Sequence, residues 1–183
     1  MHGSKQLVYD SQPFFFLDQN EKTYEERYIL WKQNKSDTIF WVLYIQLWMK
    51  LEEIYMENVI DYYKKNCCEK KIFFELVEYQ KNFFEGNIKI QLLTSYFYTT
   101  TEYLFWINQE NDISNIINTG RDIVRNLYEK NPENFNVYIF YICILKGKEK
   151  KRIKRKKWYQ QGIKNLFPSN SEIDKYFREI FLL

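Results

Sequence analysis

Glycine, proline and histidine are scarce in this chain, and each scarcity excludes a class of site. The 183 residues include five Gly, three Pro and one His. Dinucleotide-binding and phosphate-binding loops need several glycines in close order, and no such run occurs. The only imidazole, His2, lies at the start of the chain, so the usual general base is missing from its body. We therefore expect a protein that is not an enzyme, with no catalytic, cofactor-binding or metal-binding residues.

Cysteine is also rare, and its arrangement argues against disulfides and zinc. Cys67 and Cys68 are adjacent and Cys143 stands apart, an odd count with no CxxC spacing. A reactive thiol would need a lowered pKa, and a connection between helices is the simpler interpretation of KKNCCEKK at 64–71. These features predict an intracellular, reducing compartment.

Long hydrophobic runs are missing as well. The longest, at 39–49 and 137–145, fall short of the roughly 20 residues that span a bilayer, so we expect no membrane insertion. The opening MHGSKQ has no apolar signal core. We expect residues 1–20 to form an N-terminal extension, partly disordered or not native, and residues 21–183 to form one helical-repeat domain.

Aromatic side chains, by contrast, are abundant, and their spacing is helical. Tyr, Phe and Trp make up 20% of the residues within a hydrophobic content of 45%, enough for one sizeable core. Apolar residues recur every three or four positions, as in the stripes at 39–48 and 116–127, whereas strand-like alternation is scarce. The pattern predicts about ten helices joined by short turns, with Asp37 as an N-cap and with Pro132 and Pro168 beyond helix ends.

Two repeating patterns alternate along the chain. The first is a pair of large apolar residues three positions apart, recurring at steps of 33, 29, 35 and 35 residues. The second is a helix-like stretch between these pairs, at 52–66, 86–100, 120–134 and 156–170. A constant step means that the same helix face is presented after each hairpin. The five pairs are Trp41 with Tyr44, Phe74 with Val77, Tyr103 with Trp106, Tyr138 with Tyr141, and Ile173 with Tyr176.

Two glycines occupy matching places in the second pattern. Gly120 and Gly162 would each weaken a helix by about 1 kcal/mol relative to Ala. We expect them where two helices approach closely, so that packing explains them better than flexibility.

The chain resembles the half-a-TPR, or HAT, repeat family over about residues 22–183. The stretches 37–50, 71–87 and 136–148 are similar to the family's first helix, which carries an aromatic residue followed three positions later by Tyr, and RDIVRNLYEKNPEN is similar to its second. Val77 and Ile173 depart from that pattern, which leaves HAT and ordinary TPR-like repeats as alternatives. The resemblance implies an all-α, right-handed solenoid of about five antiparallel helical hairpins. It also implies a scaffold in RNA-processing assemblies, such as crooked-neck-like splicing factors, pre-mRNA cleavage factors or ribosome-biogenesis proteins. The same resemblance favours the nucleus over the cytoplasm.

A weaker resemblance points to the TPR domain of spindle-checkpoint proteins of the Bub and Mad3 type. It lies in 39–48, similar to the opening helix of that domain, and in 158–183, similar to its end. The region between them holds one hairpin too many for that family.

One segment concentrates the positive charge. Residues 146–157 carry nine Lys or Arg and one Glu in a chain whose net charge is only +3. The segment is a solvated helix face, a contact for RNA or an acidic protein, or a nuclear import signal. Tyr159 should be buried, whereas Trp158 could lie beside the basic face and stack on single-stranded RNA. The candidate contact residues are Lys148, Lys150, Lys151, Arg152, Lys154, Arg155, Lys156, Lys157 and Trp158.

The chain ends on apolar residues, which are unusual at the end of a repeat array. Ile180, Phe181 and Leu182 should dock on the previous hairpin or on a partner, and homo-oligomerisation is one form of such docking. We therefore expect a non-catalytic scaffold for other proteins of a multi-subunit complex. The alternative is an RNA-binding or ribosome-associated protein that acts through the basic segment.

Overall fold

The computed structural model describes residues 7–8, 22–57, 59, 62, 67–83, 86–105, 113–144 and 148–182. Over these ranges the fold is all-α, as expected, with nine α-helices and one 3-10 helix. An isolated parallel bridge between Val8 and Asn134 is the one extended pairing seen in the same ranges. Of the expected extension 1–20, Leu7 and Val8 are described; His2 and Trp106 lie outside the described residues.

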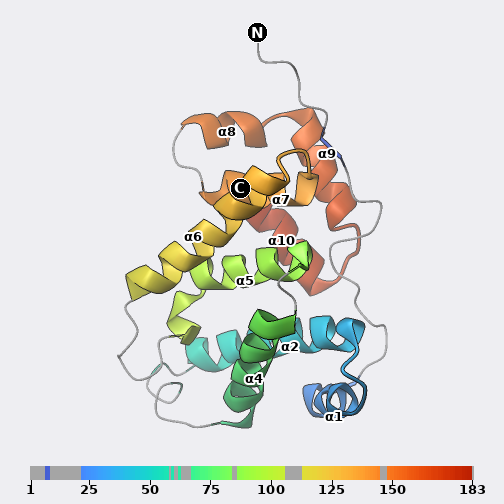
Figure 1. Cartoon of the computed structure of the whole chain (residues 1–183). Helices are drawn as coiled ribbons and strands as arrows, with labels where there is room; N and C mark the ends of the chain where they lie inside the picture. The colour runs from blue at the N-terminus through green and yellow to red at the C-terminus, as the bar shows by residue number, and fades with distance from the viewer. Residues whose placement is uncertain are drawn as a thin grey trace.

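The helices are arranged as successive layers (Figure 1). The base holds α1, α2 and α4, the middle holds α5, and α6 and α7 lie above it. At the opposite end lie α8 and α9, and α10 runs back toward α5. The bounds are α1 Tyr24–Asn34, α2 Asp37–Glu57, α4 Cys68–Phe83, α5 Ile88–Thr100, η1 Glu102–Phe105, α6 Ile113–Lys130, α7 Phe135–Ile144, α8 Lys148–Lys154, α9 Lys157–Leu166 and α10 Glu172–Leu182.

Local sequence signals explain several helix ends. Thr23 and Glu26 form a reciprocal capping box at the start of α1. Asn87 caps α5, its Oδ1 accepting from the Ile90 amide. Asp37 is not an N-cap, because α2 already includes it as its first residue.

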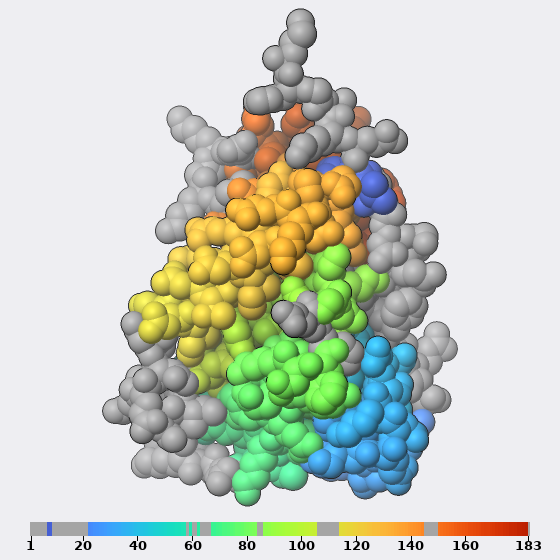
Figure 2. Space-filling view, viewed as in Figure 1, coloured from blue at the N-terminus to red at the C-terminus, as the bar shows by residue number. Residues whose placement is uncertain are grey.

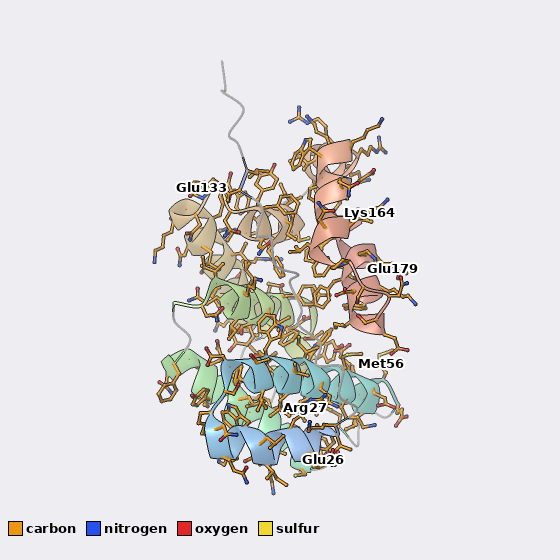
Figure 3. The ribbon with its side chains drawn as sticks, turned by 90° about the vertical axis from the view of Figure 1, so that its right-hand side faces the viewer. Glu26, Arg27, Met56, Glu133, Lys164 and Glu179 are labelled. Atoms are coloured by element: carbon orange, nitrogen blue, oxygen red, sulfur yellow. The ribbon has the colours of Figure 1, made fainter. Side chains whose placement is uncertain are left out.

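The expected boundary near residue 51 is wrong. The second-helix pattern at 52–66 predicts a new helix there, but α2 continues to Glu57 with Leu51 fully buried. No Gly or Pro interrupts 37–57, so nothing in the backbone ends the helix. As a result α2 packs against α1 and α4 rather than folding back on itself. Arg27 of α1 reaches α2 in this layer, donating to Gln46 Oε1 at 3.0 Å (Figure 3).

Aromatic rings join the layers into one core. Trp48 of α2 stacks on Phe97 of α5, with centroids 4.7 Å apart. It also contacts Tyr176 and Phe177 of α10, at 5.7 and 6.2 Å. The hydroxyls of Tyr96 and Tyr176 lie 2.8 Å apart, which links α5 to α10 as well. The last helix therefore packs on the second, a contact that an open stack of nearest neighbours does not make.

The prediction for the two glycines is confirmed. A Cβ on Gly162 would lie 2.2 Å from Cζ of Phe135, a ring that is itself buried. A Cβ on Gly120 would lie 2.9 Å from the Ser95 carbonyl oxygen. Both glycines therefore sit where one helix presses against another.

Candidate functional site

The basic segment divides into inward-facing and outward-facing side chains. Lys150 Nζ donates to the Cys143 carbonyl at 3.0 Å, and Lys154 Nζ donates to the Ile180 carbonyl at 3.1 Å. These carbonyls lie in the last turns of α7 and α10, where the helix dipole favours a cation. Both lysines therefore anchor α8 to the rest of the fold.

Burial perturbs the groups around this anchor. Lys154 is only 7% exposed, and loss of solvation lowers the pKa of its ammonium. Burial likewise raises the pKa of the Cys143 thiol to about 11, despite the nearby lysines. The thiol is therefore protonated at neutral pH and unsuited to nucleophilic chemistry.

The remaining cations of the segment face solvent. Lys151, Arg152, Arg155, Lys156 and Lys157 are all exposed. Arg152 has an interaction partner. In the described part of the chain, no ion-pair or hydrogen-bond partner contacts the other four side chains, Lys151, Arg155, Lys156 and Lys157. The side chain of Lys148, the first residue of α8, lies outside the described residues.

An aromatic row adjoins these cations. Trp158, 38% exposed, lies 6.0 Å from Tyr138 of α7, which lies 6.2 Å from Tyr128 of α6. Tyr128 stacks on Tyr141 with centroids 4.0 Å apart. Tyr159 is fully buried and donates to the Phe181 carbonyl, which confirms its expected place in the core. The exposed cations and Trp158 together are called the basic-aromatic surface below.

The apolar C-terminal residues are largely occupied within the chain. Phe181 is fully buried against Phe140 and Phe167, with centroids 5.0 and 5.7 Å away. Leu182 is half-buried, and Ile180 is 36% exposed. This end therefore docks on the helices that precede it, and Ile180 keeps the most accessible surface of the three.

A second candidate region is a groove bordered by α4, α5, α6 and α7. It consists of hollows of about 670 and 630 Å³ that share Gly86 and Ile88 in their walls. Figure 2 shows α4 (green) and α6 (yellow to orange) at the surface of the same face. Seven of the wall residues are carboxamides, and we call the two hollows together the amide groove: Gln80, Asn87, Gln91, Asn126, Asn131, Asn134 and Asn136.

Asn136 has an unusual environment in this groove. Its side chain is only 2% exposed, and no group in the ranges that the structure describes donates to its Oδ1. A buried acceptor without a donor costs about 1–3 kcal/mol. The same hollow is lined by Asp37, Asn87 and Asn134, at the beginnings of α2, α5 and α7. The N-terminal ends of three helix dipoles therefore converge on it.

The cysteine pair lies where α4 begins. Cys68 is the first residue of that helix and is exposed, whereas Cys67 precedes it and is half-buried. Burial raises the pKa of the Cys67 thiol, so neither the helix nor its neighbours activate this sulfur.

Sequence reasoning located the basic segment but missed the amide groove. Asparagines in connections between helices are typical turn residues, so the sequence gives them no binding role. The fold alone brings the asparagines of separate turns to the wall of the amide groove. The sequence predicts part of the aromatic row, because Tyr138 and Tyr141 form one of the repeat pairs. It gives no separate signal for Tyr128.

Comparison with protein-family models, with curated proteins and with solved structures gives no match. Within the described ranges, none of the helices is both long and apolar enough to cross a bilayer. The same ranges contain no cluster of three or more His, Cys, Asp or Glu side chains suited to a metal ion.

Proposed function

We propose that this chain is a non-catalytic helical scaffold that binds another protein in the amide groove. The observation that carries the proposal is the lining of the groove, where polar side chains from α4, α5, α6 and α7 border two hollows that share Gly86 and Ile88.

The composition of the groove suits an extended segment of a partner. A carboxamide offers a donor and an acceptor together, the same pair that a peptide unit presents. Three of the seven carboxamides already bond within the chain, because Asn87 and Asn134 accept from the Ile90 and Val137 amides and Asn131 donates to the Leu127 carbonyl. Asn126 is the most exposed of the seven and is therefore the one most open to a bound backbone. The converging helix N-termini favour a segment that carries acidic residues or a carboxylate. Three lysines, Lys81, Lys89 and Lys130, and one carboxylate, Asp37, line the walls, and Lys81 is paired with Glu78.

The wider setting of the proposal comes from the sequence period. In its more specific form, the proposal is that the chain forms a right-handed stack of HAT-like hairpins within a nuclear RNA-processing assembly. Consecutive packing of α6 on α7 and of α9 on α10 supports hairpins of this kind. The contact between α2 and α10 makes the proposed stack short and closed rather than open-ended.

Affinity capture with a groove-filling variant tests the proposal. Asn126→Trp places a large ring in the groove wall from an exposed position of α6, and Asn118→Trp makes the same change on that helix outside the groove. The tagged protein and both variants would be used to capture partners from native lysate, with and without RNase.

We expect partners that survive RNase, are retained by Asn118→Trp and are lost with Asn126→Trp. Loss of every partner on RNase treatment, or full retention by Asn126→Trp, would contradict the proposal.

A further inference from the structure

We propose that the basic-aromatic surface of α8 and α9 binds single-stranded RNA. This goes beyond the scaffold function and concerns a different part of the molecule, so either proposal can fail without the other.

The first argument is uncompensated charge. Lys151, Arg155, Lys156 and Lys157 are exposed, and in the described part of the chain their side chains have no partner. Some other exposed cations of this protein are paired, as Lys32 is with Glu75 and Lys81 with Glu78, both at 2.6 Å. A run of unpaired cations over so short a stretch raises the local concentration of polyanions, which the rest of the mildly acidic chain does not do.

The second argument is that α8 is held in a fixed position. Lys150 and Lys154 turn inward and donate to the carbonyls of Cys143 and Ile180. A solvated helix face needs no such anchors, because its charged side chains gain nothing from a fixed orientation. The anchors fix the helix backbone that carries the remaining cations, which lowers the entropic cost of binding an RNA backbone.

The third argument selects the single strand. Trp158 keeps 38% of its surface exposed directly after the last cation of the run. Its indole contacts the rings of Tyr138 and Tyr159, with centroids 6.0 and 5.9 Å away. An exposed ring on a rigid support is a stacking platform for an unpaired base. A duplex hides the faces of its bases and cannot use such a platform.

Fluorescence anisotropy of labelled 12-nucleotide oligouridylate tests the proposal. The full chain would be compared with Arg155→Ser/Lys156→Ser/Lys157→Ser and with a control triple of equal charge change, Lys32→Ser/Lys71→Ser/Lys175→Ser, all at exposed positions. Lys154 is left unchanged, because it is buried and its loss would confuse folding with binding. Trp158→Ser and Trp158→Phe test the ring separately.

We expect oligouridylate affinity to fall steeply with salt, and the first triple to lose at least about 10-fold at 50 mM salt while the control triple stays within about 2-fold. Trp158→Ser should lose about 5- to 100-fold, and Trp158→Phe should regain most of it. A 12-base-pair RNA duplex and a polyglutamate of equal charge should compete poorly.

Three results would overturn the proposal. One is equal loss in both triples. Another is unchanged affinity in Trp158→Ser. The third is competition by duplex or polyglutamate as strong as that by oligouridylate. Circular dichroism of each variant separates unfolding from a loss of contact, and Trp158→Phe keeps the test valid if Trp158→Ser unfolds.

Discussion

At the scale of single residues, two glycines mark the tightest contacts between helices. Gly162→Ala would drive a methyl group into the buried ring of Phe135. Overpacking of this kind costs about 1–3 kcal/mol, and the helix preference of Ala returns about 1 kcal/mol. We predict that Gly162→Ala lowers the free energy of unfolding by up to about 2 kcal/mol in urea titrations. Gly86→Ala is the matched control, since a Cβ there meets nothing within 4 Å, and it should be close to neutral. Equal stability of the two variants would contradict the packing.

The thiols give a second prediction at this scale. Burial raises the pKa of the Cys143 thiol to about 11, and burial at a separate site raises the pKa of the Cys67 thiol. Cys68 is exposed. At pH 8 we expect Cys68 to react first with an aromatic disulfide reagent and Cys143 to react last, because Cys143 is half-buried and its pKa is raised. Because the neutral thiol is favoured in the fold, the stability from Cys143 is present below the unfolded pKa of about 8.5 and is lost as pH rises toward 11. Rapid modification of native Cys68→Ser protein at residue 143 would contradict this account.

At the scale of elements, α8 has only seven residues and is held in place by the hydrogen bonds of its inward lysines, Lys150 and Lys154. Lys154→Met removes the hydrogen bond to the Ile180 carbonyl. We expect hydrogen exchange in α8 and in the last turn of α10 to speed up by about 5-fold or more, because an unmade hydrogen bond to a charged donor is worth about 1.5–3 kcal/mol. Lys156→Met, at an exposed position, should leave both helices unchanged. Similar exchange in the two variants would show that the anchor is unimportant.

The elements also show how far the sequence could lead. Helical periodicity located α4, α5, α7, α9 and α10 to within a few residues, because amphipathic spacing is a local signal. The repeat pattern misplaces the end of α2, because it begins a new helix at residue 52 although no Gly or Pro ends the helix before Glu57. The inward turn of Lys150 and Lys154 could not be predicted, since it depends on which helix ends α8 meets in space. The same is true of the amide groove, whose carboxamides lie in four helices and in the connections before α5 and α7.

At the scale of the whole molecule, the contact between α2 and α10 makes the fold one cooperative unit. Trp48 touches both α5 and α10, so the end of the chain stabilises its beginning. We predict that urea unfolding followed by tryptophan fluorescence and by circular dichroism gives coincident transitions. Trp48→Ala should cost about 3–5 kcal/mol and destabilise all layers together. Separate transitions for the two probes would instead indicate a stack that unfolds hairpin by hairpin.

The central claim is that this molecule holds another protein in the amide groove. Site-specific photo-crosslinking in native lysate tests this claim most directly. Benzoylphenylalanine would be placed at position 130 in the groove wall and, as the control, at the exposed position 175 of α10. The account predicts that position 130 yields a discrete protein adduct resistant to RNase and that position 175 does not. No adduct from position 130, or the same adducts from both positions, would contradict it.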